Sequence, residues 1–414
     1  MAQSQSLAAD RSSNPPGWPA LVGGGLLNVA IGTYYAFSAF YAPLEKEFGW
    51  VRTQTSYISI INMVFLAIMF NVASMLIDKL GSRVIAVIGG LCFCAGMFMA
   101  SYSDSLTMMY VSMAIVGTGL GFGYLPPITV GFKWFPNHRG LVSGLAVGIF
   151  AAGSGIFGPV LTHIIATDGW RIAFRDMSML FFVFTMAGAF LLKDPPASYV
   201  VAAPKAKKAS APKTAADVTP GQMLAMPRFY PLWLAFCFGT AAGTMVISQL
   251  VPFARGAGYS AEIASFAITI GAIGSASGRF LSGWVSDHFG RLRSVRVILV
   301  VSIIATPSLY IFREQLSLFY PLLFLVYYCY GTQLSVYTAL AGDFYGTKYV
   351  GRNYGIMLLA WGTAGLLGPK IGANVFVATG TYQYAFFGAA ALAVAALVLL
   401  IFARPPAEVR TAHA

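Results

Sequence analysis

Twelve long apolar stretches run through this chain of 414 residues, and they limit what it can fold into. Each is long enough to cross a bilayer as an α-helix, which takes about 20 residues. They lie at 18–43, 54–77, 83–102, 106–127, 140–165, 174–192, 229–253, 262–285, 294–312, 319–342, 353–378 and 382–403. Only 10% of the residues are charged, against about 25% in a soluble protein. The sequence therefore predicts an all-α integral membrane protein with twelve transmembrane helices.

Lysine and arginine are distributed unevenly between the connecting loops. If the N-terminus faces the cytoplasm, the inner loops and tails hold 18 of the 26 and the outer loops hold six. Cytoplasmic loops normally carry such an excess, so we expect both termini to be cytoplasmic. The first span is too long for a signal-peptide core and has no clear small-residue cleavage site, so we expect the N-terminal segment to be retained. The net charge of +12 then reflects topology. A lipid bilayer is the expected partner, and nucleic acid is not.

No pattern in the sequence predicts a metal site or catalytic chemistry. The four cysteines fall within predicted spans, where buried thiols behave as small apolar residues. Paired catalytic acids and a Ser–His–acid set are also missing from the sequence. We therefore expect no cofactor and no enzymatic activity.

A stretch rich in Lys, Ala and Pro separates two sets of six spans. We expect it to be a disordered cytoplasmic linker, because it has no hydrophobic face to bury. The predicted organisation is an N-terminal tail at 1–17, a first bundle at 18–192, the linker at 193–228, a second bundle at 229–403 and a C-terminal tail at 404–414.

The two halves of the chain repeat each other. Segment 78–81 (Asp-Lys-Leu-Gly) recurs as 287–290 (Asp-His-Phe-Gly), at an offset of 209. Segment 155–159 (Gly-Ile-Phe-Gly-Pro) recurs as 365–369 (Gly-Leu-Leu-Gly-Pro), at an offset of 210. Two parallel six-helix repeats are typical of transporters that bind their substrate between the halves. The sequence thus predicts two pseudo-symmetric six-helix bundles.

The repeated Asp–Gly–Arg loops are candidates for a gate. Asp78 and Arg83 lie in the first loop, and Asp287 and Arg291 lie in the second. The arginine can bridge to a neighbouring helix and so stabilise one of two rocking states. The alternative is a helix cap combined with a cation that sets the topology.

Arg279 is the only charged residue in an apolar run from Phe266 to Val285. Such a charge costs about 3 kcal/mol in the hydrocarbon layer, so embedded arginines are usually functional. The fourteen acidic residues all map to tails, loops or span ends. We therefore expect the guanidinium to bind a small anionic substrate. The alternative is a structural pairing with neighbouring backbone or with Asp287.

Further candidates for the site are polar or aromatic residues within spans. Tyr327, Tyr330 and Tyr337 follow helical spacing along one face of span 319–342, and Tyr330 is the preferred one. The others are Asn28, Tyr34, Tyr35, Tyr124 and Lys370. The alternatives are aromatic packing for the tyrosines, close helix packing for the glycines before Tyr124, and snorkelling for Lys370.

Several of these motifs resemble a known family. The paired Asp–Gly–Arg loops are similar to the signature of the major facilitator superfamily, over nearly the whole chain. Segment 134–145 (Trp-Phe-Pro-Asn-His-Arg-Gly-Leu-Val-Ser-Gly-Leu) resembles the loop entering helix 5 of monocarboxylate transporters and oxalate/formate antiporters. Segment 345–355 resembles the bacterial members of that group, and Arg279 matches the arginine with which the family grips a carboxylate.

The chain departs from the family at three positions. Ser275 stands where mammalian members have an Asp, and Ala39 is near the place of a helix 1 Lys. Trp361 stands where dicarboxylate members carry a Lys, although Lys370 follows nine residues later. The family's groups for proton coupling are therefore not carried over. Ser275 itself joins the candidate substrate-binding residues.

The resemblance implies a bacterial inner-membrane carrier of a small monocarboxylate such as L-lactate, with a proton as the second partner and a monomer as the expected state. Without an embedded carboxylate, three routes for coupling remain: the substrate carries the proton, a span-end group such as His163 or Asp176 relays it, or the carrier exchanges anions. The alternative functions are an oxalate/formate-type antiporter and a membrane sensor that binds a carboxylate without moving it.

Overall fold

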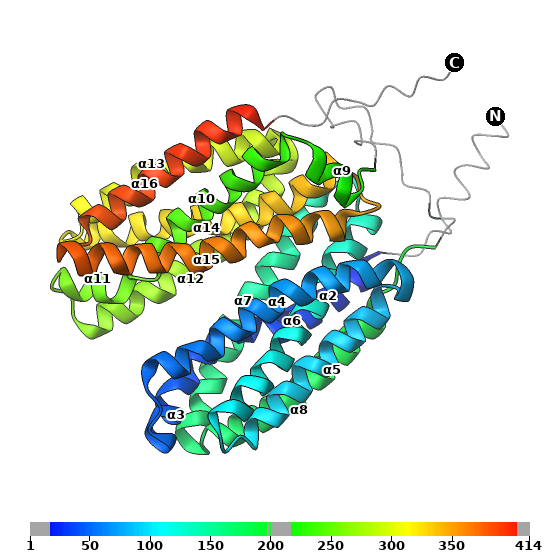
Figure 1. Cartoon of the computed structure of the whole chain (residues 1–414), viewed down its shortest axis with the longest axis horizontal. Helices are drawn as coiled ribbons and strands as arrows, with labels where there is room; N and C mark the ends of the chain where they lie inside the picture. Colours follow the sequence, from blue (N-terminus) through cyan, green and yellow to red (C-terminus); the bar gives the residue numbers. More distant parts are fainter. Residues whose placement is uncertain (1–16, 197–198, 200–216, 404–414) are drawn as a thin grey trace. The chain divides into compact units, whose positions relative to one another are not determined.

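The computed structural model describes residues 17–196, 199 and 217–403, and its regular structure is helical (Figure 1). In the first half the elements are α2 (Trp18–Ile31), the 3₁₀ helix η1 (Gly32–Phe40), α3 (Tyr41–Phe48), α4 (Arg52–Leu80), α5 (Ser82–Ser101), α6 (Leu106–Trp134), α7 (Arg139–Thr167) and α8 (Trp170–Leu191). They are followed by α9 (Pro220–Ala225), α10 (Phe229–Ile247), α11 (Leu250–Gly256), α12 (Ala261–Phe289), α13 (Arg291–Ile311), α14 (Leu316–Tyr345), α15 (Val350–Thr379) and α16 (Gln383–Phe402).

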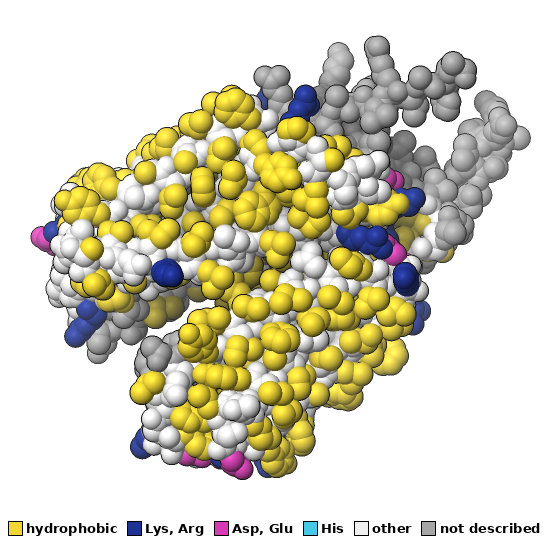
Figure 2. Space-filling model, in the orientation of Figure 1, with side chains coloured by type: hydrophobic (Ala, Val, Ile, Leu, Met, Phe, Trp, Pro, Cys, Tyr) yellow, Lys and Arg dark blue, Asp and Glu magenta, His cyan; other side chains and the backbone are white. Residues whose placement is uncertain are grey.

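Ten spans in the described residues are long and apolar enough to cross a membrane, the first running through α2, η1 and α3. Helices α12 and α14 complete the twelve transmembrane helices. They contain 29 and 30 residues, and they carry Arg279 in α12 and several tyrosines with Gln333 in α14. Large apolar side chains such as Val377 and Phe190 are mostly exposed, and hydrophobic side chains cover most of the face seen in Figure 2. A lipid bilayer would cover such a surface.

The described residues form two compact units. The first contains 17–139 and 159–196, and the second contains 140–158 and 217–403. Helix α7 therefore contributes its first part to the second unit and its last turns to the first. The predicted bundle limits of 18–192 and 229–403 stay a prediction.

Two predicted spans are less regular than expected. The first contains the 3₁₀ stretch η1, which winds with about three residues per turn. The predicted span 229–253 is divided at Ser248–Gln249 into α10 and α11.

The expectation that the linker 193–228 has nothing to bury is wrong for residues 217–228. The Val218 amide donates to the Tyr345 carbonyl at 3.0 Å, and Asn353 Nδ2 donates to the Val218 carbonyl at 2.9 Å. Thr219 caps α9, whose Met223 is fully buried. This part of the linker is anchored by two buried hydrophobic side chains, Val218 and Met223, and by hydrogen bonds to the Val218 backbone.

The repeated loops share one backbone conformation. Gly81 has φ 80° and ψ 157°, and Gly290 has φ 90° and ψ 142°. Side chains other than glycine rarely adopt a positive φ of this kind. The repeat seen in the sequence is thus also a repeat of local geometry, and each glycine lets a new helix begin directly after it.

The glycines of α6 allow close helix packing. A Cβ on Gly119 would lie 2.2 Å from the Phe93 amide nitrogen of α5, and one on Gly117 would lie 2.6 Å from the Asn62 carbonyl of α4. This confirms the packing interpretation of the glycines before Tyr124.

Candidate functional site

Arg279 lies on α12 and is only 4% exposed. Its Nε is buried without a hydrogen-bond partner. Within the part of the chain that the structure describes, its guanidinium makes no ion pair or hydrogen bond. An unpaired buried charge is expensive. Arg279 thus has the properties of a residue that can bind an anionic ligand from outside the protein.

The backbone around Arg279 is held by close helix contacts. A Cβ on Gly278 would lie 2.2 Å from the Tyr328 carbonyl of α14. A Cβ on Gly144, in the part of α7 that belongs to the second unit, would lie 2.7 Å from the Arg279 carbonyl. These contacts leave no room for larger residues, and they fix the point from which the Arg279 side chain projects.

Ser275 lies one turn before Arg279 and is 8% exposed. Its backbone contacts α14, where a Cβ on Gly331 would lie 2.2 Å from the Ser275 carbonyl. A hydroxyl therefore occupies the turn beside the cation. Its predicted role in substrate binding stays a prediction.

Tyr330 packs between α10 and α15. Its ring lies against Gly243 of α10, and its hydroxyl accepts a hydrogen bond from Trp361 Nε1 of α15 at 3.1 Å. Trp361, at the position where the resemblance implies a lysine in dicarboxylate carriers, thus acts as a neutral donor that orients a tyrosine.

Tyr327, one of the tyrosines predicted along one face of α14, contacts a different helix from the others. Its ring packs on Gly271 of α12, whereas the Tyr337 ring stacks on Phe236 of α10, with centroids 4.2 Å apart. Successive tyrosines on α14 therefore face different helices of the second unit.

The candidates on the first helices and on α6 all belong to the first unit. Asn28 is fully buried, Tyr34 is 7% exposed and Tyr35 is 37% exposed. Between Asn28 and Tyr35 the chain changes from the α-helix α2 to the 3₁₀ helix η1. Tyr124 is buried with its ring 6.0 Å from that of Phe70. Their part in a substrate site stays a prediction.

Lys370 follows Pro369 within α15 and is exposed. Its ammonium group makes no hydrogen bond or ion pair among the described residues. Neither attraction of the substrate nor snorkelling is tested by this geometry.

The first Asp–Gly–Arg loop joins α4 to α5. Arg83 Nη2 donates to the Phe190 carbonyl of α8 at 2.8 Å, so the arginine does bridge to a neighbouring helix. Asp78 is exposed at the end of α4. A gating role for the two residues stays a prediction.

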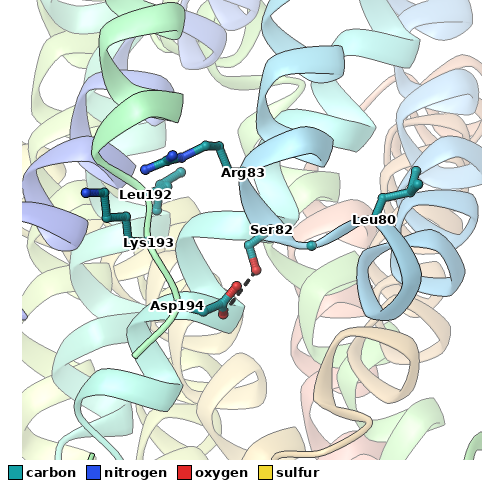
Figure 3. A pocket seen from close by; sticks show the side chains of 7 residues that line it. Leu80, Ser82, Arg83, Leu192, Lys193 and Asp194 are labelled. Atoms are coloured by element: carbon teal, nitrogen blue, oxygen red, sulfur yellow. Dashed lines mark hydrogen bonds between the residues drawn. The ribbon is translucent and has the colours of Figure 1, made fainter. Parts of the chain in front are cut away.

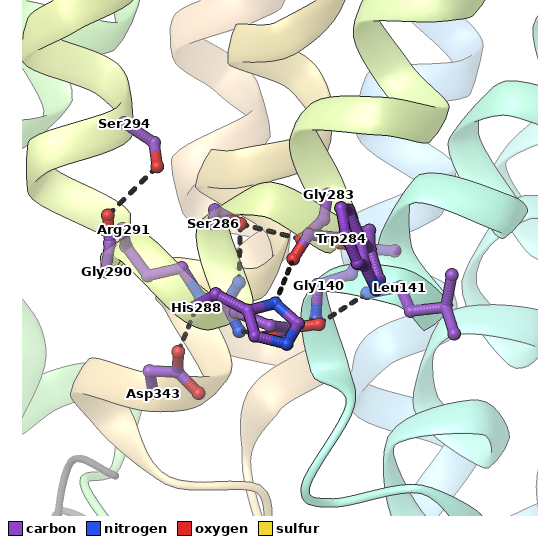
Figure 4. A network of polar contacts seen from close by, with 12 residues as sticks. Gly140, Leu141, Gly283, Trp284, Ser286, His288, Gly290, Arg291, Ser294 and Asp343 are labelled. Carbon is purple, nitrogen blue, oxygen red and sulfur yellow. Dashed lines mark hydrogen bonds and ion pairs between the residues drawn. The ribbon is translucent and has the colours of Figure 1, made fainter. Parts of the chain in front are cut away.

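The second loop forms a buried network of charges. Arg291, which is 9% exposed, donates to Asp287 Oδ1, and its Nε donates to Asp343 Oδ2 at 2.7 Å (Figure 4). The same Asp287 carboxylate accepts from the Gly140 amide at 2.9 Å and the Leu141 amide at 3.0 Å. Asp287 therefore caps the N-terminus of α7, where the helix dipole favours an anion.

Two members of this network were missed by the sequence analysis. Asp343 lies 52 residues from Arg291 in the sequence, and Ser286 Oγ accepts from Arg291 Nη1 at 2.5 Å. The only available signal was the place of Asp343 at the end of a predicted span. The network also excludes the alternative that Asp287 serves as the partner of Arg279, because Asp287 is bound to Arg291 and α7 instead.

Comparisons with known proteins agree with this architecture. Residues 24–369 and 258–414 match the profile of the Major Facilitator Superfamily. The crystal structure of the transporter FucP in the outward conformation is similar over 94% of this chain and 99% of its own, with a TM-score of 0.72 and 16% identity. That likeness concerns the fold alone.

Curated relatives resemble the chain over most of its length. The uncharacterized transporter YhjX of Escherichia coli is 27% identical over 83% of this chain and 85% of its own. The oxalate:formate antiporter of Oxalobacter formigenes is 25% identical over 92% and 89%, respectively. Human monocarboxylate transporter 2 is 26% identical over 94% and 86%.

Proposed function

Since the chain belongs to the Major Facilitator Superfamily of membrane transporters, and is therefore a multi-pass carrier and not an enzyme, we propose that it moves a small monocarboxylate such as L-lactate together with a proton. Transport proceeds by alternating access across the bacterial inner membrane, with both termini in the cytoplasm and the chain acting as a monomer. The observation that carries this proposal is Arg279, a buried arginine without a partner among the described residues.

The charge balance favours one carboxylate per substrate. Arg279 supplies one positive charge, and Trp361 offers a neutral indole donor to Tyr330. A guanidinium binds one carboxylate bidentately. The names of two relatives, a monocarboxylate transporter and an oxalate:formate antiporter, also refer to carboxylates.

The network around Arg291 would act as the inner gate. By sequence, α7 belongs to the first predicted bundle and α12 to the second. The two hydrogen bonds from α7 to Asp287 would then hold the closed state and break when the carrier opens to the cytoplasm. Arg291, itself bound to Asp343, would keep the Asp287 carboxylate in place in both states, with Asp78 and Arg83 as the counterparts in the first half.

Proton coupling would rely on the substrate. His163 and Asp176, the two span-end groups that could relay a proton, are both exposed. Asp176 already pairs with the adjacent Arg175 at 3.0 Å. A carboxylic acid can bring its own proton. The carboxylate would bind as an anion at one step of the transport cycle, and the proton would be released at another.

The test is uptake of labelled L-lactate into proteoliposomes, with and without an inward proton gradient. Arg279→Ala should lower uptake at least about 30-fold, because a desolvated charge pair is lost. Arg296→Ala is the matched control, since that arginine donates to the Leu400 carbonyl, away from the proposed site. Full uptake by Arg279→Ala would remove the basis of the proposal.

The second candidate is an exchanger of the oxalate/formate type, favoured by the relative from Oxalobacter formigenes. It predicts uptake only into vesicles preloaded with oxalate or formate, with no response to a proton gradient. Loss of this exchange on Lys370→Gln would assign the second cation to Lys370.

A further inference from the structure

A pocket of about 350 Å³ lies at one end of the first unit, outside the residues proposed for the substrate. It is lined by residues 80–83, at the turn from α4 to α5, and by residues 192–194, which follow α8. Figure 3 shows the charged ends of Arg83 and Lys193 on the same side of this pocket.

The positive charge in the pocket exceeds the negative charge. Asp194 is the one carboxylate among the lining residues, and Lys133 Nζ already binds it at 2.7 Å. The Lys193 ammonium makes no hydrogen bond within the described part of the chain. Arg83 uses Nη2 for the Phe190 carbonyl and keeps a buried Nε without a partner. With Asp194 paired to Lys133, the two lining cations Arg83 and Lys193 have no carboxylate partner among the lining residues, which leaves a charge that an anion can balance.

The surroundings of the pocket are those of a membrane interface. It lies where α4 and α8 end and α5 begins, on the side that we predict to be cytoplasmic. Leu80, Val84, Phe190 and Leu191 beside it are 38–63% exposed. A soluble anion would gain nothing from this apolar rim, whereas an amphiphile would bury it.

An apolar groove, separate from this pocket, runs along α5 and α8. It is lined by Leu91, Cys94, Ala95 and Phe98 of α5 and by Ser178, Met179 and Phe182 of α8. Leu91 lies eight residues beyond Arg83, which is about 12 Å along α5 at helical rise. The half-thickness of the hydrocarbon core is about 15 Å, so an acyl chain whose phosphate sat beside Arg83 would reach the Leu91 end of this groove.

We propose that the pocket and the groove together form a binding site for an anionic diacyl phospholipid. The phosphate lies between Arg83 and Lys193, with support from the positive end of α5, and one acyl chain follows α5 and α8 into the groove. The inner leaflet is the anionic one that such a site would meet.

The experiment measures lipid binding to the purified full-length protein by native mass spectrometry, with dioleoylphosphatidylglycerol, dioleoylphosphatidylcholine and inorganic phosphate as probes. The native chain should prefer the anionic lipid. Lys193→Gln should lower that preference about fivefold, and Arg83→Gln/Lys193→Gln more than about tenfold, as expected for the loss of one and two interfacial cations. Arg296→Gln, which removes a cation bonded to a helix-end carbonyl of the second unit, should change nothing.

Substitution in the groove separates the lipid from a soluble anion. Ala95→Phe fills the groove and should weaken the binding of both lipids to a similar extent. An unchanged lipid preference in both Lys193→Gln and the double variant would overturn the proposal. So would displacement of the anionic lipid by inorganic phosphate at equal concentration, since the site would then belong to a soluble anion.

Discussion

Two buried arginines of the second unit should respond to the same substitution with opposite signs. Arg279 is 4% exposed and Arg291 is 9% exposed. The first has no partner among the described residues, whereas the second is bound to Asp287, Asp343 and Ser286. The two arginines are thus buried to nearly the same extent, and they differ in whether the guanidinium is bound to a carboxylate.

The magnitudes follow from what each methionine substitution leaves behind. Arg279→Met removes an unpaired charge from the hydrocarbon layer and should raise the free energy of unfolding by about 2–3 kcal/mol. Arg291→Met leaves Asp287 and Asp343 without their cation and should lower it by about 3–5 kcal/mol. The two variants should therefore differ by about 6 kcal/mol, and Arg279→Met should be stable but inactive, the usual trade-off at a functional site.

Denaturant unfolding in a single detergent, followed by the fluorescence of the seven tryptophans, measures both variants on one scale. Transport assays on the same preparations show whether Arg279→Met has lost its activity. If Arg279→Met unfolds as early as Arg291→Met, then Arg279 has a partner within the protein. The proposal that Arg279 binds the substrate carboxylate would then be wrong.

Four further substitutions test the packing and the site. Gly278→Val should lower stability by about 1–3 kcal/mol because its Cβ would overlap an α14 carbonyl, whereas Gly155→Ala, with open space around it, should be neutral or stabilising by thermal unfolding. Trp361→Phe removes the donor to Tyr330 and should raise the KM for substrate about fivefold with little change in stability, as expected for one hydrogen bond. Met223→Ala should cost about 2–5 kcal/mol because the linker loses one of its buried anchors, and an unchanged unfolding midpoint would contradict that role.

The sequence predicted the features that depend on local pattern. Apolar stretches of about 20 residues define the spans because the bilayer admits little else, and the repeated Gly81 and Gly290 indicated turns that the structure places at the same positive φ. It could not predict contacts that depend on helix rotation. The spacing of Tyr327 and Tyr330 puts them on one side of α14, but it did not indicate that one ring packs on α12 and the other on α10. A helix that is surrounded by other helices has no polar side, so its sequence does not indicate which side faces which neighbour.

The two repeated loops also differ in the direction of their arginine side chains, which the sequence repeat did not predict. Counting by the offset of 209, the residue after Gly81 is Ser82, and the residue after Gly290 is Arg291. In the second loop the arginine turns inward to Asp287 and Asp343, so its charge is balanced within the unit. In the first loop Ser82 donates to Asp194, and the next residue, Arg83, turns to a backbone carbonyl that balances none of its charge. A repeat can therefore keep its backbone while the arginine of one half pairs with carboxylates and the arginine of the other half binds a backbone carbonyl.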